Sequence, residues 1–197
     1  ILFGLALTIL LIQQDMGTST LFIIIYTALI YLATGKKRLV LVSALAILTA
    51  GIFGYRLFDV IRLRVDAWIN PWLDPSGRSF QIVQSLIAVA AGGIFGRGPG
   101  LGSPRLIPVA HSDFIFSAIS EEVGLTGSIG LLILMAMLIF CGMRIAFSAS
   151  NQFHRYLAAG LSTYILAQGI LIIAGNLRLL PLTGVTLPFI SYGGSSL

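Results

Sequence analysis

Long stretches of this chain carry no charged side chain, and this pattern restricts the fold more than any single motif does. The uncharged runs cover residues 1–12, 19–34, 39–55, 80–96, 123–143, 156–177 and 179–197. About 20 consecutive apolar residues cross a bilayer as a helix, and only 10% of the residues are charged, against roughly 25% in soluble domains. We therefore expect an all-α, polytopic integral membrane protein with about seven transmembrane helices, not a water-soluble enzyme.

The ends of the sequence and its charge refine this expectation. Ile1 and Leu197 both lie inside apolar runs, which indicates an internal fragment of a larger protein, with one transmembrane domain over residues 1–197. The formal net charge is +5, and the basic residues form short clusters between apolar runs. Such clusters favour contacts with membrane lipid head groups and not with nucleic acid. The single cysteine, Cys141, excludes an intrachain disulfide.

One segment between the third and fourth runs has the pattern of an amphipathic helix. Its apolar residues recur at steps of three and four: Phe58, Ile61, Val65, Trp68 and Trp72. Arg62 and Asp66 lie one turn apart on another face. Residues 55–74 are therefore expected to form a helix at the membrane surface, with both tryptophans at the depth of the head groups.

The most polar segment is a loop that is followed by several ionisable residues. From Gly96 to Pro104 it contains four glycines and two prolines, which exclude a regular helix. The ionisable residues after it are His111, Asp113, Glu121 and Glu122. Because ionisable groups are costly in membrane proteins, this loop is the first candidate for a functional site.

The residues alone allow three interpretations of this loop. In the first, Ser112 or Asp113 caps the following helix and the charges are solvated. In the second, His111, Asp113 and a glutamate bind a metal, for which two ligands one residue apart are weak support. In the third, a carboxylate is a general base, and Arg97 and Arg105 hold an anionic lipid head group.

Two other features have simpler interpretations. The spacing of Gly92 and Gly96 is typical of close helix packing. Asp15, between Gln14 and Met16, is either a helix boundary or a buried functional acid, and its spacing does not decide between the two.

Short motifs follow one another along nearly the whole chain. They are Gln14-Asp15-Met16-Gly17-Thr18, Asn70-Pro71 with Asp74-Pro75, Gln81 with Gln84-Ser85, Gly96-Arg97-Gly98, His111-Ser112-Asp113-Phe114-Ile115-Phe116, Glu121-Glu122-Val123-Gly124, Leu180-Pro181-Leu182-Thr183-Gly184 and Leu187-Pro188-Phe189-Ile190-Ser191-Tyr192-Gly193-Gly194-Ser195-Ser196-Leu197. In order and spacing they resemble the motifs of the FtsW/RodA/SpoVE (SEDS) family. The chain departs from the family pattern at Val109, where a glutamate is usual, and its loop between Gly98 and His111 is short.

The resemblance implies an architecture and a location. The intact protein is expected to have ten transmembrane helices in a bacterial inner or plasma membrane, and this chain holds roughly the fourth to most of the tenth. Residues 55–78 are expected to be an amphipathic cytoplasmic segment, and residues 97–122 an extracytoplasmic polar loop. Lys36-Lys37-Arg38 is expected outside the cell.

The resemblance also implies a peptidoglycan glycosyltransferase that polymerises lipid II during division or elongation, with a class B penicillin-binding protein as partner. Asp113 matches the family's essential acid, and we assign it as the general base that takes the proton of a sugar hydroxyl. The expected substrate-binding residues are Arg97, Arg105, His111, Glu121, Glu122, Ser191 and Tyr192. The sequence does not identify a cofactor, and a divalent cation such as magnesium or manganese is one candidate. A lipid II flippase and a non-catalytic scaffold that recruits a penicillin-binding protein are the alternative functions.

Overall fold

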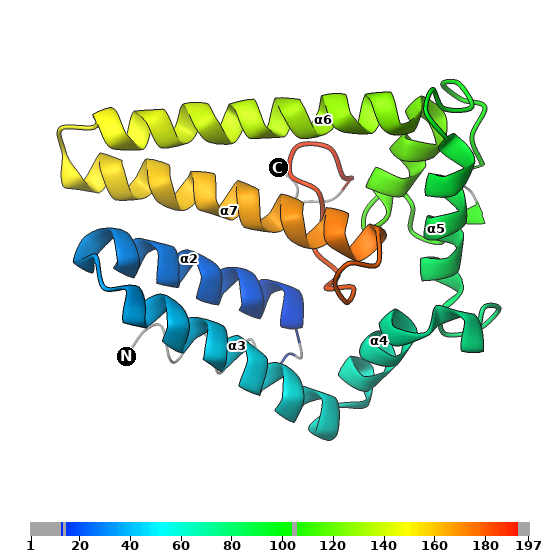
Figure 1. Ribbon diagram of the computed structural model, residues 1–197, viewed down its shortest axis with the longest axis horizontal. Coiled ribbons are helices and arrows are strands. Elements are labelled where there is room, and N and C mark those ends of the chain that lie inside the picture. The colour runs from blue at the N-terminus through cyan, green and yellow to red at the C-terminus, as the bar shows by residue number, and fades with distance from the viewer. Residues whose placement is uncertain (1–12, 14, 104–105, 193–197) are drawn as a thin grey trace. The chain divides into compact units, whose positions relative to one another are not determined.

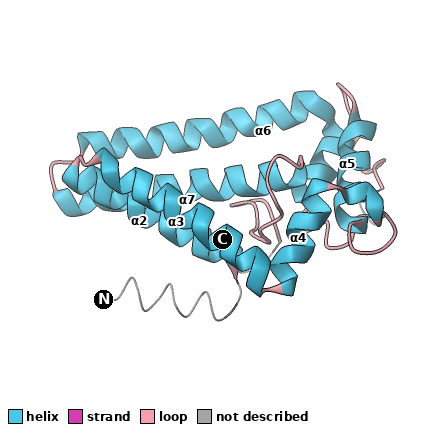
Figure 2. Cartoon of the chain, turned by 60° about the horizontal axis from the view of Figure 1, so that its bottom comes forward, coloured by secondary structure: helices cyan, strands magenta, loops and turns pink. Residues whose placement is uncertain are grey.

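The protein is described by a computed structural model, which covers residues 13, 15–103 and 106–192. Its helices, in chain order, are α2 (Met16–Thr34), α3 (Lys37–Leu57), α4 (Asp59–Ile69), the short 3-10 helix η1 (Pro71–Leu73), α5 (Phe80–Gly92), α6 (Ile115–Ser148) and α7 (Gln152–Asn176). The covered residues form helices and loops without a strand (Figure 2). The expected all-α fold is confirmed.

Four of the helices, α2, α3, α6 and α7, are long and apolar enough to cross a membrane. Helix α5 has 13 residues, or about 20 Å at 1.5 Å per residue, which is short of the roughly 30 Å hydrocarbon core. Residues 179–192 form bends, turns and irregular backbone, and residues 1–12 lie outside the described part. The protein is a multi-pass membrane protein, but the expected seven transmembrane helices are not matched, because the described residues supply four candidate spans.

The chain divides into two compact units, and each is described by itself. Unit 1 comprises Ile1–Asp59 and Met135–Ala167, and unit 2 comprises Val60–Leu134 and Gln168–Leu197. Unit 1 therefore holds α2, α3 and the ends of α6 and α7 that meet at their connecting turn. Unit 2 holds α4, α5, the first part of α6 and the end of α7.

Helix α2 in unit 1 has well-defined ends. Its N-cap is Asp15, whose Oδ1 accepts the backbone N–H of Thr18 at 3.0 Å and whose Oδ2 accepts the Thr18 hydroxyl at 2.7 Å. The helix ends at Gly35, which has a φ of 67°, a left-handed conformation that glycine adopts without a Cβ penalty. Because Asp15 is exposed, the structure supports the interpretation of this acid as a helix boundary.

Small residues bring the helices of unit 1 together. A Cβ added at Gly160 of α7 would lie 3.4 Å from Leu29 of α2, and one at Gly142 of α6 would overlap Ser162 of α7. Large apolar side chains stay exposed on α3 and α6, among them Leu41, Leu45, Leu48, Ile52, Phe140 and Phe147. Such faces are expected where lipid chains surround the helices, because lipid chains are as apolar as leucine side chains.

The two helix turns of unit 1 lie at the same end of that unit (Figure 1). The α2–α3 turn carries Lys36, Lys37 and Arg38, and Arg144 and Arg155 flank the α6–α7 turn. The sequence has no Asp or Glu near either turn. This end of unit 1 therefore concentrates positive charge.

The core of unit 2 forms where α5 meets the loop that precedes α6. Ala88 of α5 packs with Ile107 and Phe114 of the loop, and Leu182 covers this cluster from the segment after α7. Phe114 is 2% exposed. This packing fixes the residue directly after Asp113 in a buried position.

The amphipathic segment is shorter than expected, because α3 continues to Leu57 and α4 ends at Ile69. The stop at Asn70 follows from Pro71, since a proline disfavours helical geometry in the residue before it. Trp68 Nε1 donates to the Arg178 carbonyl at 3.1 Å, and Arg178 Nε donates to the Trp68 carbonyl at 2.8 Å. The prediction of one helix over residues 55–74 is therefore wrong. The hydrogen bonds between Trp68 and Arg178 connect α4 to the segment that follows α7.

Candidate functional site

The glycine-rich segment after α5 pairs with a break in α6. At Gly124 the backbone has a φ of 67° and a ψ of −165°, so the helix is interrupted there. The amides of Leu125 and Thr126 donate to the carbonyls of Gly93 and Ile94 at 2.9 and 3.1 Å. The break thus redirects helix hydrogen bonds to the turn that follows α5.

The pairing is reciprocal, because this segment also donates to the carbonyls that the break leaves free. Arg97 N–H donates to the Glu121 carbonyl at 3.0 Å, and Gly98 N–H donates to the Glu122 carbonyl at 2.9 Å. A Cβ at Gly96 or Gly124 would overlap backbone atoms of the paired segment. Gly92 and Gly96 therefore let the backbone after α5 come close to the backbone of α6. The predicted packing of one helix on another does not extend to Gly96, because α5 ends at Gly92.

The break places the two neighbouring glutamates in different surroundings. Glu121 is 3% exposed, and its Oε1 accepts a hydrogen bond from Arg97 Nη1 at 2.9 Å in a salt bridge. A buried carboxylate requires such a partner. Arg97 and Glu121, both predicted to bind substrate, therefore bind each other, and Arg105 lies outside the described residues.

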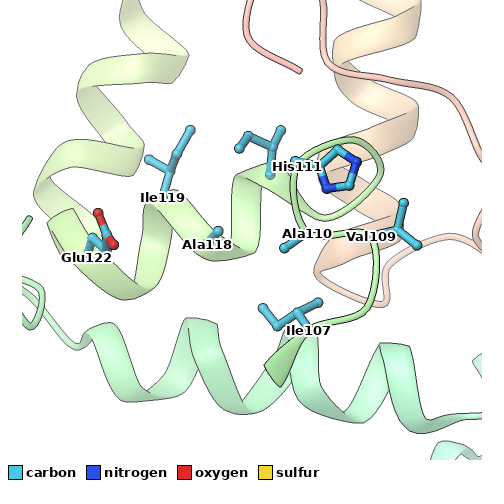
Figure 3. Close-up of a pocket in the computed structure, with 8 residues that line it drawn as sticks. Ile107, Val109, Ala110, His111, Ala118, Ile119 and Glu122 are labelled. Carbon is cyan, nitrogen blue, oxygen red and sulfur yellow. The ribbon is translucent and has the colours of Figure 1, made fainter. Parts of the chain in front are cut away.

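Glu122 faces a cavity of about 430 Å³ that it shares with His111 (Figure 3). The other lining residues are predominantly apolar: Ile107, Val109, Ala110, Ile115, Ala118 and Ile119. His111 is exposed, and its ring makes an edge contact with Tyr192 at a centroid distance of 5.9 Å. The structure thus brings together His111 and Glu122 of the predicted site residues.

Asp113 lies in a second cavity of unit 2, with a volume of about 280 Å³. The polar residues that line this cavity with it are Arg64 of α4, Arg78 and Gln81. Its apolar wall is formed by Leu63, Ala67, Ile82, Phe114 and Leu182. One aspartate and two arginines therefore line the same partly apolar cavity, an arrangement suited to an anionic substrate with a proton to lose.

This cavity bears on the expected topology. Residues 55–78 were expected in the cytoplasm and the loop at 97–122 outside, yet Arg64 and Arg78 line the same cavity as Asp113. The expected separation required α5 to cross the membrane, and its 13 residues are fewer than the roughly 20 of a typical span.

The cap of α6 is provided by Asn176, at the end of α7, and not by Ser112 or Asp113. Asn176 Oδ1 accepts the backbone N–H of Ser117 at 3.3 Å and the Ser117 hydroxyl at 2.8 Å. The one donor to the Asp113 carboxylate within the described part of the chain is the Ser112 hydroxyl, at 3.0 Å. The capping interpretation of Asp113 is therefore wrong, and most of its carboxylate remains available.

Ser191 and Tyr192, predicted to bind substrate, contact the backbone of the Asp113 segment. The Ser191 hydroxyl donates to the Ser112 carbonyl at 2.7 Å, and the Tyr192 N–H donates to the His111 carbonyl at 2.8 Å. Neither residue lines the cavity of Asp113. Ser191 is buried, whereas Tyr192 is 79% exposed.

The described residues give no support to a protein-held divalent cation. No three His, Cys, Asp or Glu side chains among them lie close enough together to ligate a metal. His111 and Asp113, proposed as ligands on their spacing, line different cavities. We therefore derive no chemical step through a resident metal ion.

Sequence reasoning missed Arg64, Arg78, Gln81 and Asn176. Gln81 lies in a motif that was noted, but nothing in the spacing connects it with Asp113, 32 positions later. Arg64 was one of several charges on an amphipathic helix. The family resemblance identifies the motif that contains Gln81, but it does not indicate which residues Gln81 lies near in the fold.

Comparisons with known proteins agree in family and in fold. The family model FTSW_RODA_SPOVE, described as "Cell cycle protein", matches residues 1–197. The peptidoglycan glycosyltransferase RodA of Mycobacterium tuberculosis (strain H37Rv) is 41% identical over 189 residues, which are 96% of this chain and 40% of that protein. Stage V sporulation protein E of Bacillus subtilis is 38% identical over 196 residues, 98% of this chain and 53% of that protein.

A probable peptidoglycan glycosyltransferase FtsW of Geobacter sulfurreducens is 37% identical over 199 residues, 100% of this chain and 53% of that protein. Among solved structures, one described as "Structural coordination of polymerization and crosslinking by a peptidoglycan synthase complex" has a TM-score of 0.73 and 28% identity. The match covers 98% of this chain and 54% of that one. The chain thus spans about half the length of the relatives it matches.

Proposed function

Because this chain belongs to the FtsW/RodA/SpoVE family of cell cycle proteins, we propose that the protein of which it is part polymerises lipid II as a peptidoglycan glycosyltransferase. Relatives that share 37–41% identity with it are named as such enzymes. The observation that carries the proposal is the cavity that Asp113 lines together with Arg64 and Arg78.

The reaction joins a sugar hydroxyl of one lipid-linked chain to the anomeric carbon of another. The oxygen of the hydroxyl forms the new glycosidic bond, the bond from the anomeric carbon to the pyrophosphate breaks, and the lipid pyrophosphate leaves with the electron pair. Asp113 takes the proton of the attacking hydroxyl, since a neutral hydroxyl is a poor nucleophile. The pyrophosphate is a good leaving group, so one carboxylate is sufficient.

Arg64 and Arg78 stabilise the charge that develops on the departing pyrophosphate. A guanidinium matches the oxygen geometry of phosphate groups and stays charged at any physiological pH. Fixed positive groups in a partly apolar cavity act more strongly than they would in water. This assignment replaces Arg97 as the principal phosphate contact, because Arg97 is paired with Glu121.

We also propose a topology in which α5 does not cross the membrane. Each of the four candidate spans then takes the chain to the opposite side, so the α2–α3 and α6–α7 turns share one side and Asp113 lies on the other. The family resemblance implies that the polar loop at residues 97–122 lies outside the cell. In our proposal Asp113 therefore faces the outside of the inner or plasma membrane, and Lys36-Lys37-Arg38 faces the cytoplasm, contrary to the sequence expectation.

A class B penicillin-binding protein is the proposed partner. The structural neighbour belongs to a complex described as coordinating polymerization and crosslinking, and a glycan polymerase needs a crosslinking enzyme on the same side of the membrane. Asp113 and its cavity lie on the side that we assign to the outside, where the penicillin-binding domain would meet the new glycan.

The test is polymer formation from purified lipid II by the full-length protein in detergent, with its partner present. Replacing Asp113 with Asn keeps the side chain's size and removes the proton acceptor, so polymerisation should fall by roughly 10²–10⁴-fold. Thermal stability should stay near wild type, because Asn176 and not Asp113 caps α6. Asp59→Asn, the same change at an exposed position of α4, is the matched control and should leave the rate unchanged.

The assay also separates the alternatives, because no transbilayer movement is needed in detergent. A flippase or a non-catalytic scaffold would produce no polymer from purified lipid II. Normal polymerisation by folded Asp113→Asn protein would refute the assignment of the base while leaving the enzyme class intact.

A further inference from the structure

Three consecutive carbonyls of the segment that carries Asp113 are each held by a donor from the C-terminal part of unit 2. The His111 carbonyl accepts the Tyr192 N–H at 2.8 Å. The Ser112 carbonyl accepts the Ser191 hydroxyl at 2.7 Å, and the Asp113 carbonyl accepts Asn176 Nδ2 at 2.8 Å. These donors come from two places, the end of α7 and the turn at residues 187–192.

Asn176 is the most constrained of these donors. It is fully buried, and its Nδ2 also donates to the Ile172 carbonyl at 2.9 Å in its own helix. Its Oδ1 accepts two hydrogen bonds from Ser117, and its carbonyl accepts the Ser85 hydroxyl at 3.1 Å. Asn176 therefore ties α5, the first turn of α6 and the end of α7 to the backbone of Asp113, the contact with α5 through its backbone carbonyl and the others through its side-chain amide.

Ser191 is anchored in a comparable way. Its hydroxyl oxygen accepts the Leu187 N–H at 2.8 Å while it donates to Ser112. Leu187 is 0% exposed, so the turn that carries Ser191 is itself fixed in the core. The bond to the Ser112 carbonyl therefore connects the Asp113 segment to a rigid support.

A general base acts only within hydrogen-bond distance of the proton that it takes, and a displacement of about 1 Å from remote mutations can cost 10²-fold in rate. The Asp113 carboxylate itself has a single hydrogen bond, to the neighbouring Ser112 hydroxyl. Its position must therefore come from the backbone, and the backbone is fixed by the three donors.

We infer that Asn176 and Ser191 are positioning residues for Asp113, which they hold through the Asp113 and Ser112 carbonyls. This inference rests on the proposed function, in which Asp113 is the general base. It differs from the sequence expectation that Ser191 binds substrate. Neither side chain lines the cavity of Asp113, so neither is proposed to touch the reacting atoms.

The experiment measures kcat and KM for lipid II with the full-length protein and its partner. Ser191→Ala and Asn176→Leu each remove one of the donors, and the leucine keeps a similar volume. Each should lower kcat by about 10- to 100-fold and leave KM within about twofold, since substrate binding is untouched. The matched control is Ser120→Ala, which also removes a buried hydroxyl with two hydrogen bonds, at 2.8 Å each to the Phe116 carbonyl and Ser128.

Thermal melting separates misplacement from unfolding, because Ser191→Ala and Ser120→Ala lose similar buried hydrogen bonds and should melt at similar temperatures. The inference is overturned if kcat of folded Ser191→Ala equals that of the Ser120→Ala control, or if KM rises while kcat holds. Asp113→Asn is measured in parallel. If Asp113→Asn polymerises normally, the proposed base is wrong; if it is inactive while Ser191→Ala is normal, the positioning inference alone fails.

Discussion

At the scale of single residues, the cavity of Asp113 is defined by charge. A carboxylate and two guanidinium groups share about 280 Å³ with an apolar wall. Two positive groups for one negative group leave the cavity with a net positive charge when it is empty. The cavity therefore attracts a negatively charged ligand such as a pyrophosphate.

This excess of positive charge gives a prediction for Arg64 and Arg78. Replacing either with Gln removes a charge that stabilises the leaving group, so kcat should fall by about 10²-fold. Arg62→Gln is the matched control, because Arg62 is on the same helix but does not line the cavity. Equal losses in Arg62→Gln and Arg64→Gln in the lipid II polymerisation assay would show that α4 contributes only its overall charge.

The candidate residues show how far a sequence can identify a site. Asp113 was identified because it follows a polar loop and lies in a motif. Arg64 was not, because its approach to Asp113 depends on the docking of α4 against the segment after α7, where Arg64 Nη1 donates to the Thr183 carbonyl at 3.3 Å. Periodicity predicts the helix face on which Arg64 lies. Only the tertiary contact with Thr183 shows that this face lines the same cavity as Asp113.

At the scale of elements, the break in α6 is the feature with the strictest steric requirement. Gly124 has a positive φ, and a Cβ there would overlap Gly96 and Ile94. Without the break, the carbonyls of Glu121 and Glu122 would bond within α6, and the segment at Gly96–Gly98 would lose its partners. The position of both glutamates therefore depends on one glycine.

We expect Gly124→Ala to destabilise the protein by several kcal/mol, since backbone strain and a steric overlap act together. Gly130→Ala is the matched control in the same helix, where a Cβ meets nothing within 4 Å. That substitution should be neutral or stabilise the protein by roughly 0.5–1 kcal/mol, because alanine is the better helix former. Melting temperatures in detergent measure both changes, and similar melting of the two variants would contradict the steric account.

The elements themselves were predicted unevenly. The runs at 19–34, 39–55 and 156–177 correspond to α2, α3 and α7. A long apolar stretch inside a bilayer forms a helix because a helix satisfies its own backbone hydrogen bonds. The run at 80–96 gave a helix of only 13 residues, because α5 ends at Gly92 and the carbonyls of Gly93 and Ile94 accept hydrogen bonds from α6. A hydropathy pattern shows which residues are uncharged, but it does not show where within such a run a helix ends, as α5 does at Gly92.

At the scale of the whole molecule, the four candidate spans and the short α5 define which segments share a side. The expectation placed the residues of α4 and the polar loop on opposite sides because it counted α5 as a crossing. In the proposed topology, without that crossing, the two basic turns share one side and every acid from Asp59 to Glu122 lies on the other side.

Single cysteines in a background without other cysteines test this topology in membrane vesicles of both orientations. Lys37→Cys, in the α2–α3 turn, should react with an impermeant maleimide only in inside-out vesicles. Trp72→Cys and Tyr192→Cys replace side chains that are 57% and 79% exposed, and both should react only in right-side-out vesicles. Labelling of Tyr192→Cys from the same side as Lys37→Cys, with Trp72→Cys labelled from the opposite side, would restore α5 as a crossing.

The break at Gly124 also sets a depth. Backbone groups that leave a helix need partners, and the hydrocarbon interior offers none except protein. The part of α6 from Leu125 to Ser148 is about 36 Å long at 1.5 Å per residue, which matches a crossing of roughly 30 Å with a modest tilt. In the proposed topology Gly124 therefore lies near the level at which the bilayer interior ends. The first turns of α6, from Ile115 to Val123, then lie at the height of the lipid head groups, where the proposed lipid-linked substrate carries its pyrophosphate.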